Sequence, residues 1–192
     1  MNGNEPKVLA PEPVSRRRFI SLGAAALALP FISRIPAAAF SEPLPPDRGL
    51  SLYNTHTGEQ AAVDYCHSGS LLSPSLEKIN HILRDHRTGE TKDIDVRLLD
   101  LLHALSRKAG ADRPFHIISG YRSPRTNAHL RANGSGVAEN SLHLLGKAVD
   151  IRVPGLKLRD LYRAAVSLRG GGVGIYPKSD FVHVDIGRVR TW

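Results

Sequence analysis

Several residue types are scarce in this sequence, and each shortage excludes a class of protein. The 192 residues include one cysteine, Cys66, and aromatic residues make up 6% of the chain. A single cysteine excludes an internal disulfide and a metal site built from thiolates. The chain also has no lysine-rich tract and no aromatic stacking motif, so it gives no sign of a nucleic-acid partner. Any metal must therefore be held by histidine and carboxylate side chains.

Long apolar runs are missing as well. A weakly apolar run extends from Ile20 to Ile32, but Ser21, Gly23 and Pro30 interrupt it. Because a membrane-spanning helix needs about 20 apolar residues, we expect no stable membrane span once the N-terminus has been processed.

The residues around this run have the composition of an export signal. Paired arginines precede it in Ser15-Arg16-Arg17-Arg18-Phe19-Ile20, and Ala37-Ala38-Ala39 offers a cleavage site after it. Residues 1–39 therefore resemble a twin-arginine signal peptide, which the twin-arginine export machinery reads. This interpretation predicts a periplasmic location, and an uncleaved N-terminal anchor is the alternative.

The remainder of the chain has the length of one ordinary domain, which we expect to be a monomer. Residues 40–49 contain three prolines and are interpreted as a linker, and residues 50–192 as the domain itself. The formal charge of +8 falls when the signal is removed, because the signal is itself basic. A modestly basic surface suits an anionic polymer such as the cell wall, and it suits an ordinary basic domain equally well.

Apolar periodicity and turn residues predict a mixture of strands and helices. Ser73, Asp95 and Ser123 are predicted helix caps, and Gly110 is predicted to end the second helix. The expected fold class is α+β: a small, mostly antiparallel sheet with helices on one face and the other face left for chemistry. Strands are expected at residues 50–53, 60–65, 115–118, 149–153, 173–176 and 181–186, and helices from residue 73, at 96–109, from 124 to about 133, and at 158–168.

Two of these strands direct polar side chains toward a common face. Successive side chains of a strand point to opposite faces, so Asp150 points away from the apolar Val149 and Ile151 that flank it. His183 alternates in the same way with its two valine neighbours. Both polar side chains are therefore predicted on the open face of the sheet.

His143 precedes Asp150 by seven residues and completes a set of two imidazoles and one carboxylate with His183. Such a set holds a catalytic zinc ion and leaves the fourth coordination position to water. Zinc lowers the pKa of that water to about 7, so a nucleophile for amide hydrolysis exists at neutral pH. The hypothesis is a zinc site formed by His143, Asp150 and His183.

Hydrolysis also needs a proton acceptor, and a donor for the charge that develops on the substrate carbonyl oxygen. Asp180 and Asp185 flank His183, and either is a candidate base. Arg122 lies in the loop between a predicted strand and a predicted helix, and its fork of donors makes it the candidate for the second role.

Other reactive residues are interpreted as structural. Cys66 and His67 are adjacent, but neighbours on a strand point to opposite faces, which argues against a nucleophilic pair. Three further histidines are interpreted as surface or core residues: His86, His103 and His116.

Several separated motifs together resemble a known family. Residues 49–192 are similar to the zinc murein endopeptidases of the murein endopeptidase K type, in the group that includes lysostaphin, D-Ala-D-Ala metallopeptidases and hedgehog domains. The motifs are, in chain order, Leu52-Tyr-Asn-Thr-His-Thr-Gly-Glu59, Ser119-Gly-Tyr-Arg-Ser-Pro124, Ser141-x-His143-x6-Asp150, Gly174-x-Tyr176, Phe181-Val-His-Val-Asp185 and Arg188-Val-Arg-Thr-Trp192.

This resemblance implies a fold, a site and a substrate. It implies a hedgehog or D-Ala-D-Ala peptidase-like fold, zinc bound by His143, Asp150 and His183, and polarisation of the substrate carbonyl by Arg122. The implied substrate is the crosslinked peptide of peptidoglycan. The D-Ala-D-Ala dipeptidase branch has a glutamate base three residues before the last zinc histidine, and this sequence has Asp180 there, one methylene shorter.

The sequence therefore predicts an exported zinc endopeptidase that cleaves peptidoglycan crosslinks in cell-wall remodelling. Two alternatives stay open. One is a D-alanyl-D-alanine carboxypeptidase, which needs a clamp for the free carboxylate, and the other is a non-catalytic, zinc-containing wall-binding module.

Overall fold

The computed structural model describes residues 43–110, 112–133 and 137–192. They all belong to one compact unit. The predicted signal peptide at residues 1–39 lies outside the described residues, and so does Gly134 at the predicted end of the third helix.

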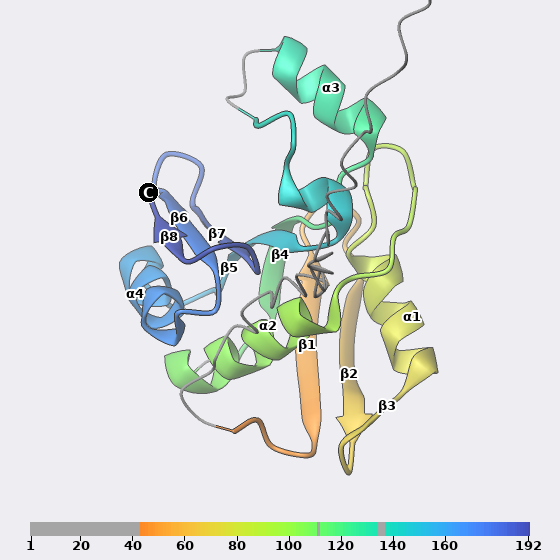
Figure 1. Ribbon diagram of the computed structural model, residues 1–192, viewed down its shortest axis with the longest axis vertical. Coiled ribbons are helices and arrows are strands. Elements are labelled where there is room, and N and C mark those ends of the chain that lie inside the picture. Colours follow the sequence, from red (N-terminus) through yellow and green to blue (C-terminus); the bar gives the residue numbers. More distant parts are fainter. Residues whose placement is uncertain (1–42, 111, 134–136) are drawn as a thin grey trace, which may run out of the picture. The chain divides into compact units, whose positions relative to one another are not determined.

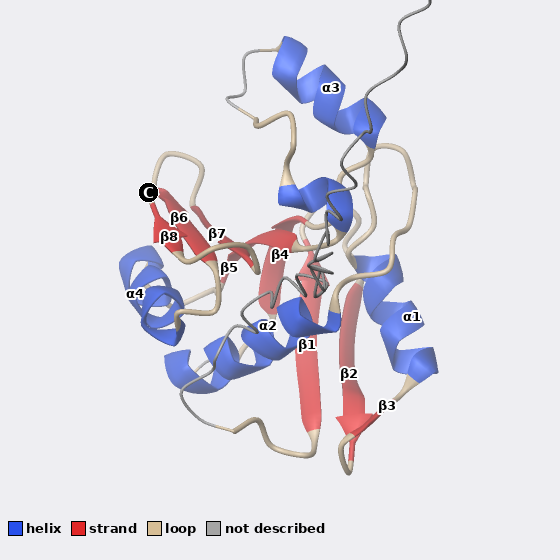
Figure 2. Cartoon of the chain, in the orientation of Figure 1, coloured by secondary structure: helices blue, strands red, loops and turns tan. Residues whose placement is uncertain are grey.

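One sheet of eight strands runs through the described chain (Figures 1 and 2). The strands are β1 (Arg48–Asn54), β2 (Gln60–His67), β3 (Ser70–Leu71), β4 (Phe115–Ser119), β5 (Ala148–Arg152), β6 (Gly172–Tyr176), β7 (Phe181–Asp185) and β8 (Arg190–Thr191). Their order is β3-β2-β1-β4-β5-β7-β6-β8. The β1–β4 and β6–β8 pairs are parallel and the others antiparallel, which confirms the mostly antiparallel sheet.

Three helices cover one face of this sheet, as the sequence predicted. Helix α1 (Ser73–Ile82) packs on β1 and β2, α2 (Val96–Ala109) packs on β1, and α4 (Leu158–Leu168) packs on β6 and β7. Helices α2 and α4 also pack against each other. Alternate apolar side chains of the strands, such as those of Leu52 and Val182, are buried beneath these helices. The core therefore lies between the helices and one face of the sheet.

Helix α3 (Pro124–Ala132) lies beyond the end of the sheet, and the short 3₁₀ helix η1 (Leu142–Leu145) lies between α3 and the sheet (Figure 1). Both belong to the connection between β4 and β5. This connection brings side chains from outside the sheet toward the ends of its central strands.

The capping residues show where local sequence decided the helix ends. Asp95 accepts a hydrogen bond from the Arg97 backbone N–H and Gly110 adopts a left-handed conformation, so both predictions for α2 are confirmed. Ser123 likewise caps α3 through the Thr126 backbone N–H. The prediction for Ser73 was wrong, because α1 starts at that residue and Leu72 is its N-cap.

Three elements were not predicted: β3, β8 and η1. Each has two to four residues, too few for an apolar period to show in the sequence. Strand β1 also begins at Arg48, two residues before the predicted start of the domain, because Arg48 and Gly49 pair with β2. Pairing between strands thus extends regular structure past the point where the local pattern ends.

The face of the sheet opposite the helices carries the predicted polar residues. Asp150 and His183 lie directly opposite each other in the β5–β7 pair, and their apolar neighbours Val149 and Val184 are buried on the helix side.

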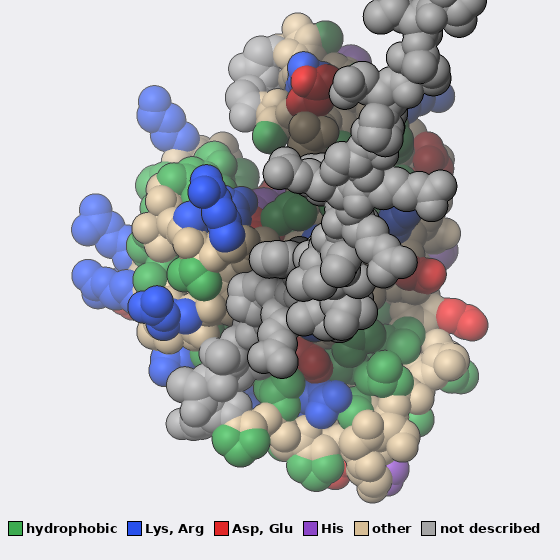
Figure 3. All heavy atoms as spheres, in the orientation of Figure 1, with side chains coloured by type: hydrophobic (Ala, Val, Ile, Leu, Met, Phe, Trp, Pro, Cys, Tyr) green, Lys and Arg blue, Asp and Glu red, His purple; other side chains and the backbone are tan. Residues whose placement is uncertain are grey.

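In the described residues no helix is long and apolar enough to cross a membrane. Basic side chains gather on the surface around α4 (Figure 3). Four basic residues within α4 or at its ends are exposed: Lys157, Arg159, Arg163 and Arg169.

Candidate metal centre

The three predicted metal ligands come from three different elements. Asp150 lies in β5 and His183 in β7, whereas His143 lies in η1, outside the strands. The Ser141 hydroxyl accepts a hydrogen bond from the His143 backbone N–H, and Gly146 ends the turn with a φ of 65°. A capped turn therefore presents His143 to the end of β5.

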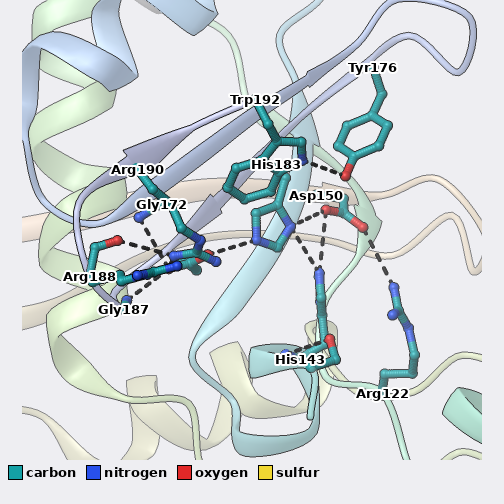
Figure 4. Close-up of polar contacts among 12 residues, drawn as sticks. Arg122, His143, Asp150, Gly172, Tyr176, His183, Gly187, Arg188, Arg190 and Trp192 are labelled. Atoms are coloured by element: carbon teal, nitrogen blue, oxygen red, sulfur yellow. Dashed lines mark hydrogen bonds and ion pairs between the residues drawn. The ribbon is translucent and has the colours of Figure 1, made fainter. Parts of the chain in front are cut away.

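The structure brings the three side chains together (Figure 4). One ligand atom from each residue lies within 4.8 Å of the others. Asp150 Oδ1 is 2.8 Å from His183 Nδ1 and 3.4 Å from His143 Nε2, and those two nitrogens are 3.2 Å apart. In the described chain this is the one group of three or more such side chains that could hold a metal ion.

The second nitrogen of each histidine is already engaged. His143 Nδ1 donates to the Gly120 carbonyl oxygen at 2.7 Å, and His183 Nε2 donates to Asp185 Oδ2 at 3.0 Å. Since a carbonyl or carboxylate oxygen accepts hydrogen bonds, these contacts place the protons on the outer nitrogens. When both rings are neutral, the inner nitrogens, His143 Nε2 and His183 Nδ1, direct their lone pairs at the same point as Asp150.

Three acceptor atoms that converge on one point repel one another unless a cation lies between them. Burial lowers the pKa of His183, but hydrogen bonds to Asp150 and Asp185 outweigh burial and raise this pKa to about 9. Burial raises the pKa of Asp150, but His143 and His183 hold it well below its usual range. The site thus attracts positive charge strongly, and its donors fit a divalent metal.

The hydrogen-bonding capacity of the Asp185 carboxylate is fully used, and one of its hydrogen bonds orients His183. Asp185 is completely buried and accepts hydrogen bonds from the backbone N–H groups of Gly172 and Gly187 and from both terminal nitrogens of Arg190, besides the one from His183. Burial raises the pKa of Asp185, but these donors hold it well below its usual range. A carboxylate with five donors has little capacity left to accept a proton from water.

Arg122 lies beside the candidate metal ligands. Its side chain is 9% exposed, and one terminal nitrogen is 3.7 Å from Asp150 Oδ2, the oxygen that faces away from His183. The same nitrogen donates to the Ser119 hydroxyl at 3.4 Å, and the buried Nε has no partner among the described residues. Burial lowers the pKa of Arg122, and the Asp150 carboxylate opposes that effect. Arg122 thus keeps donor capacity at the site.

Asp180 is placed differently from Asp185. It lies in the turn between β6 and β7 with a φ of 53°, and its side chain is 63% exposed. Its Oδ2 accepts a hydrogen bond from Arg152 at 3.0 Å. Asp180 is not among the residues that line the pocket around the candidate metal ligands. The structure therefore brings Arg122 and Asp185 to the site but leaves Asp180 at the surface.

The pocket includes aromatic residues to which sequence reasoning gave no role. It measures about 350 Å³ and contains Arg122 and the three candidate metal ligands. Tyr176, Phe181 and Trp192 also line it. Tyr176 and Trp192 belong to motifs that carried the family resemblance, but no periodic pattern joins the two residues, so their contact follows only from the fold.

The residues interpreted as structural lie away from this pocket. His103 Nδ1 donates to the Gly49 carbonyl oxygen, His116 packs on Tyr53, and His86 stacks on His56 with ring centres 3.7 Å apart. On β2, Cys66 is buried and His67 is exposed, in agreement with opposite orientations.

Comparison with known proteins identifies the family. A family model described as peptidoglycan L,D-endopeptidase MepK matches residues 43–192. The peptidoglycan L,D-endopeptidase MepK of Escherichia coli strain K12 is 41% identical over 178 residues, which cover 93% of this chain and 97% of the relative. The probable peptidoglycan L,D-endopeptidase MepK of Haemophilus influenzae is 37% identical over 179 residues, which cover 93% of this chain and 95% of the relative.

These matches cover the whole described sheet and all three candidate metal ligands. They confirm the family resemblance that the separated sequence motifs indicated. The chain belongs to the MepK family of peptidoglycan L,D-endopeptidases.

Proposed function

We propose that this protein is a zinc-dependent peptidoglycan endopeptidase that hydrolyses L,D-peptide bonds in the crosslinks of the cell wall. The observation that carries the proposal is the convergence of His143 Nε2, His183 Nδ1 and Asp150 Oδ1 on one point, with the outer nitrogen of each histidine already hydrogen-bonded. The names of the relatives supply the substrate class and the bond type. The fold, with one open face on a mostly antiparallel sheet, is proposed to be of the hedgehog and D-Ala-D-Ala peptidase kind.

Two imidazoles and one carboxylate match the ligand set of catalytic zinc sites. Bound zinc would supply a water of lowered pKa and would polarise the substrate carbonyl. The chain contributes the remaining chemistry. The buried Asp185 keeps the His183 ring in the required tautomer and orientation, because its hydrogen bond fixes the proton on Nε2.

Arg122 is proposed to bind the substrate carbonyl oxygen or a neighbouring substrate carboxylate. Its buried Nε lacks a partner, and its nearest charged neighbour, Asp150, is 3.7 Å away. A donor with unused capacity beside the reacting group stabilises negative charge as that charge develops. The same guanidinium also fits a carboxylate through two parallel hydrogen bonds.

The base role is assigned to Asp180, since the five hydrogen bonds on Asp185 support an orienting role for that residue instead. Asp180 is exposed and paired with Arg152. To act as a base it has to exchange Arg152 for the pocket, and its position in a four-residue turn next to the pocket residue Phe181 favours such a movement.

Export by the twin-arginine route and a periplasmic location are proposed on the basis of residues 1–39. The paired Arg16 and Arg17 ahead of a short apolar run support the route. Peptidoglycan named as the substrate of the relatives supports the location. Basic side chains exposed on α4 suit an anionic wall polymer.

Digestion of purified sacculi by the zinc-loaded protein, with and without a chelator, tests the function. Conversion of crosslinked dimers to monomers, lost when the chelator is present, is the expected result. Release of alanine alone would mean a carboxypeptidase, and binding without any product would mean a wall-binding module. Mass analysis of the products separates the three outcomes.

A further inference from the structure

Tyr176 lies at the end of β6 and lines the pocket together with Asp150 and His183. Its ring stacks on the Phe181 ring with centres 4.6 Å apart and planes 20° apart. Figure 4 shows its hydroxyl directed toward the metal ligands. The stacking fixes the plane of the ring, so the hydroxyl is held at the pocket rather than free to sweep through solvent.

Trp192 fixes the hydroxyl itself. The indole Nε1–H of Trp192 donates to the Tyr176 hydroxyl oxygen at 2.8 Å. An indole nitrogen is only a donor, so the tyrosine oxygen must accept here and keeps its own O–H to donate elsewhere. The contact thus turns Tyr176 into a hydrogen-bond donor with a fixed oxygen position.

The fold holds Trp192 in place through β6. The Trp192 backbone N–H donates a hydrogen bond to the Val173 carbonyl oxygen, and the Trp192 carbonyl oxygen accepts one from the Ile175 backbone N–H. The Trp192 ring lies across Gly174. A Cβ atom at Gly174 would lie 2.5 Å from the ring, so a larger residue would displace the indole. The Gly174-x-Tyr176 motif therefore has a physical reason. Gly174 leaves room for the indole ring of Trp192, and the Tyr176 hydroxyl oxygen accepts the hydrogen bond from the indole N–H.

Trp192 also contacts the side chains that hold a metal ligand. Its ring centre lies 5.3 Å from that of His183, and the Arg190 guanidinium lies 4.8 Å from the centre of the Trp192 ring. Arg190 binds Asp185, which orients His183. One connected group of side chains thus fixes both the metal ligand and the Tyr176 hydroxyl.

We propose that Tyr176 is a further catalytic residue, which donates a hydrogen bond to the substrate carbonyl oxygen, and that Trp192 is the positioning residue for its hydroxyl. This inference rests on the proposed function. As the water oxygen bonds to the carbonyl carbon, the π electron pair of the C=O bond moves onto oxygen, and the Tyr176 O–H stabilises that charge without transferring its proton. Arg122 supplies a charged donor in the same pocket, and Tyr176 supplies a neutral one.

Tyr176→Phe tests the catalytic role, because it keeps the stacked ring and removes only the hydroxyl. With a purified crosslinked dimer as substrate, we expect kcat to fall about 10²-fold, as for loss of one oxyanion donor, with little change in KM and in bound zinc. Tyr162→Phe in α4, on the covered face of the sheet, is the matched control and should behave as wild type. A kcat near that of wild type, or a defect confined to KM, would overturn the role.

A binding measurement gives a readout that does not depend on turnover. A phosphinate analogue of the tetrahedral state should bind Tyr176→Phe more weakly by a factor similar to the loss in kcat, because only the charged oxygen needs the donor. An unchanged affinity for the phosphinate, measured by calorimetry on the zinc-loaded proteins, would contradict the proposal.

Trp192→Phe tests the positioning role, since phenylalanine covers Gly174 but has no N–H to donate. We expect a smaller loss of kcat than in Tyr176→Phe, and no additional loss when the two changes are combined, because both act through one hydroxyl. An equal loss of kcat from Trp192→Phe in the wild-type and Tyr176→Phe backgrounds would overturn the positioning role.

The activity of the wild type separates the two proposals. If the zinc-loaded wild type cleaves no dimer, the proposed function and this inference both fall, whereas an active wild type with an equally active Tyr176→Phe overturns only the inference.

Discussion

Each histidine of the proposed metal centre uses its two nitrogens for different purposes. The outer nitrogens of His143 and His183 donate to Gly120 and Asp185, and the inner ones point at the metal position. The orientations of both rings are thereby fixed before a metal binds, which lowers the cost of ordering the ligands on binding. Loss of an inner nitrogen should therefore affect the metal far more than the fold.

We predict that His143→Ala and His183→Ala each lose zinc and activity while most of the fold remains. Elemental analysis and circular dichroism of the two variants, with sacculus digestion, measure these effects. His116→Ala is the control, because His116 packs on Tyr53 away from the pocket. Stoichiometric zinc together with wild-type turnover in His143→Ala would show that the site is assigned wrongly.

Asp180 and Asp185 should differ in the kind of defect that their removal causes. Asp180→Ala is predicted to lower turnover at least about 10²-fold with zinc still bound, as for loss of a general base. Asp185→Ala is predicted mainly to weaken zinc retention, by about 10–100-fold, because it frees the His183 ring. Turnover and zinc content, measured on both proteins, separate the two roles.

Arg152→Ala is the matched control for Asp180, since Arg152 is the partner that Asp180 has to leave. Its turnover should equal or exceed that of wild type if Asp180 is the base. Near-normal turnover in Asp180→Ala would remove the base role from that residue.

At the scale of elements, the segment that carries Arg122 is held by a buried carboxylate from another part of the chain. Asp85 Oδ2 accepts a hydrogen bond from the Ser123 backbone N–H, and the Tyr121 backbone N–H donates to the Leu83 carbonyl oxygen. Asp85 is 2% exposed. The segment after α1 thus fixes the start of α3, and with it the backbone of Arg122.

The pKa of Asp85 leads to a prediction about acid stability. Burial raises this pKa, but hydrogen bonds from Thr126 and Ser123 outweigh burial and hold it at about 2. A lowered pKa in the folded state stabilises the protein above the unfolded value of about 3.9, and this contribution, about 2 kcal/mol, is lost as the pH falls through 2. Asp85→Asn should therefore be less stable than wild type at pH 6, and the difference should shrink below pH 4.

Urea unfolding of wild type and Asp85→Asn at pH 6 and pH 3 measures this difference. Asp160→Asn serves as a control, because Asp160 is exposed in the first turn of α4. A stability difference between Asp85→Asn and wild type that stays constant over this pH range would show that the Asp85 charge does not hold the segment.

At the scale of the whole molecule, metal binding should stabilise the folded state, because the three ligands meet only in the folded chain. His183 has to lose a proton to bind a metal, and its pKa is raised to about 9. The raised pKa itself stabilises the metal-free protein below about 6.5, and this contribution is lost as the pH rises through 9. The proton on His183 thus competes with zinc, so the stabilisation by zinc should increase as the pH rises from 6 to 9.

Thermal unfolding with excess zinc and with a chelator, at pH 6, 7.5 and 9, checks this prediction. The gap between the two midpoints should widen with pH. A gap that narrows over this range would contradict the protonation state deduced for His183.

Export is also a property of the whole chain. Replacement of Arg16 and Arg17 by lysine conserves charge, yet it should block translocation and lead to accumulation of the cytoplasmic precursor, because a receptor reads the arginine pair. Cell fractionation with N-terminal sequencing of the mature protein measures the outcome and the cut after Ala39. Undiminished periplasmic protein from the double variant would indicate another export route.

The sequence by itself determined the strand alternation that puts Asp150 and His183 on one face, and the caps at Asp95 and Ser123. These features depend on two to four neighbouring residues, so local patterns are enough to predict them. The motifs also indicated the family, because their order and spacing together are specific.

Only the tertiary structure decided which groups surround the proposed metal ligands. Gly120 supplies an acceptor for His143 from 23 residues away. The exposed Asp180 pairs with Arg152, whereas the buried Asp185 pairs with Arg190. Trp192 reaches Tyr176 because β8 pairs with β6, and a two-residue strand gives no periodic signal. Contacts between residues far apart in the chain follow from strand pairing and packing, which no local pattern records.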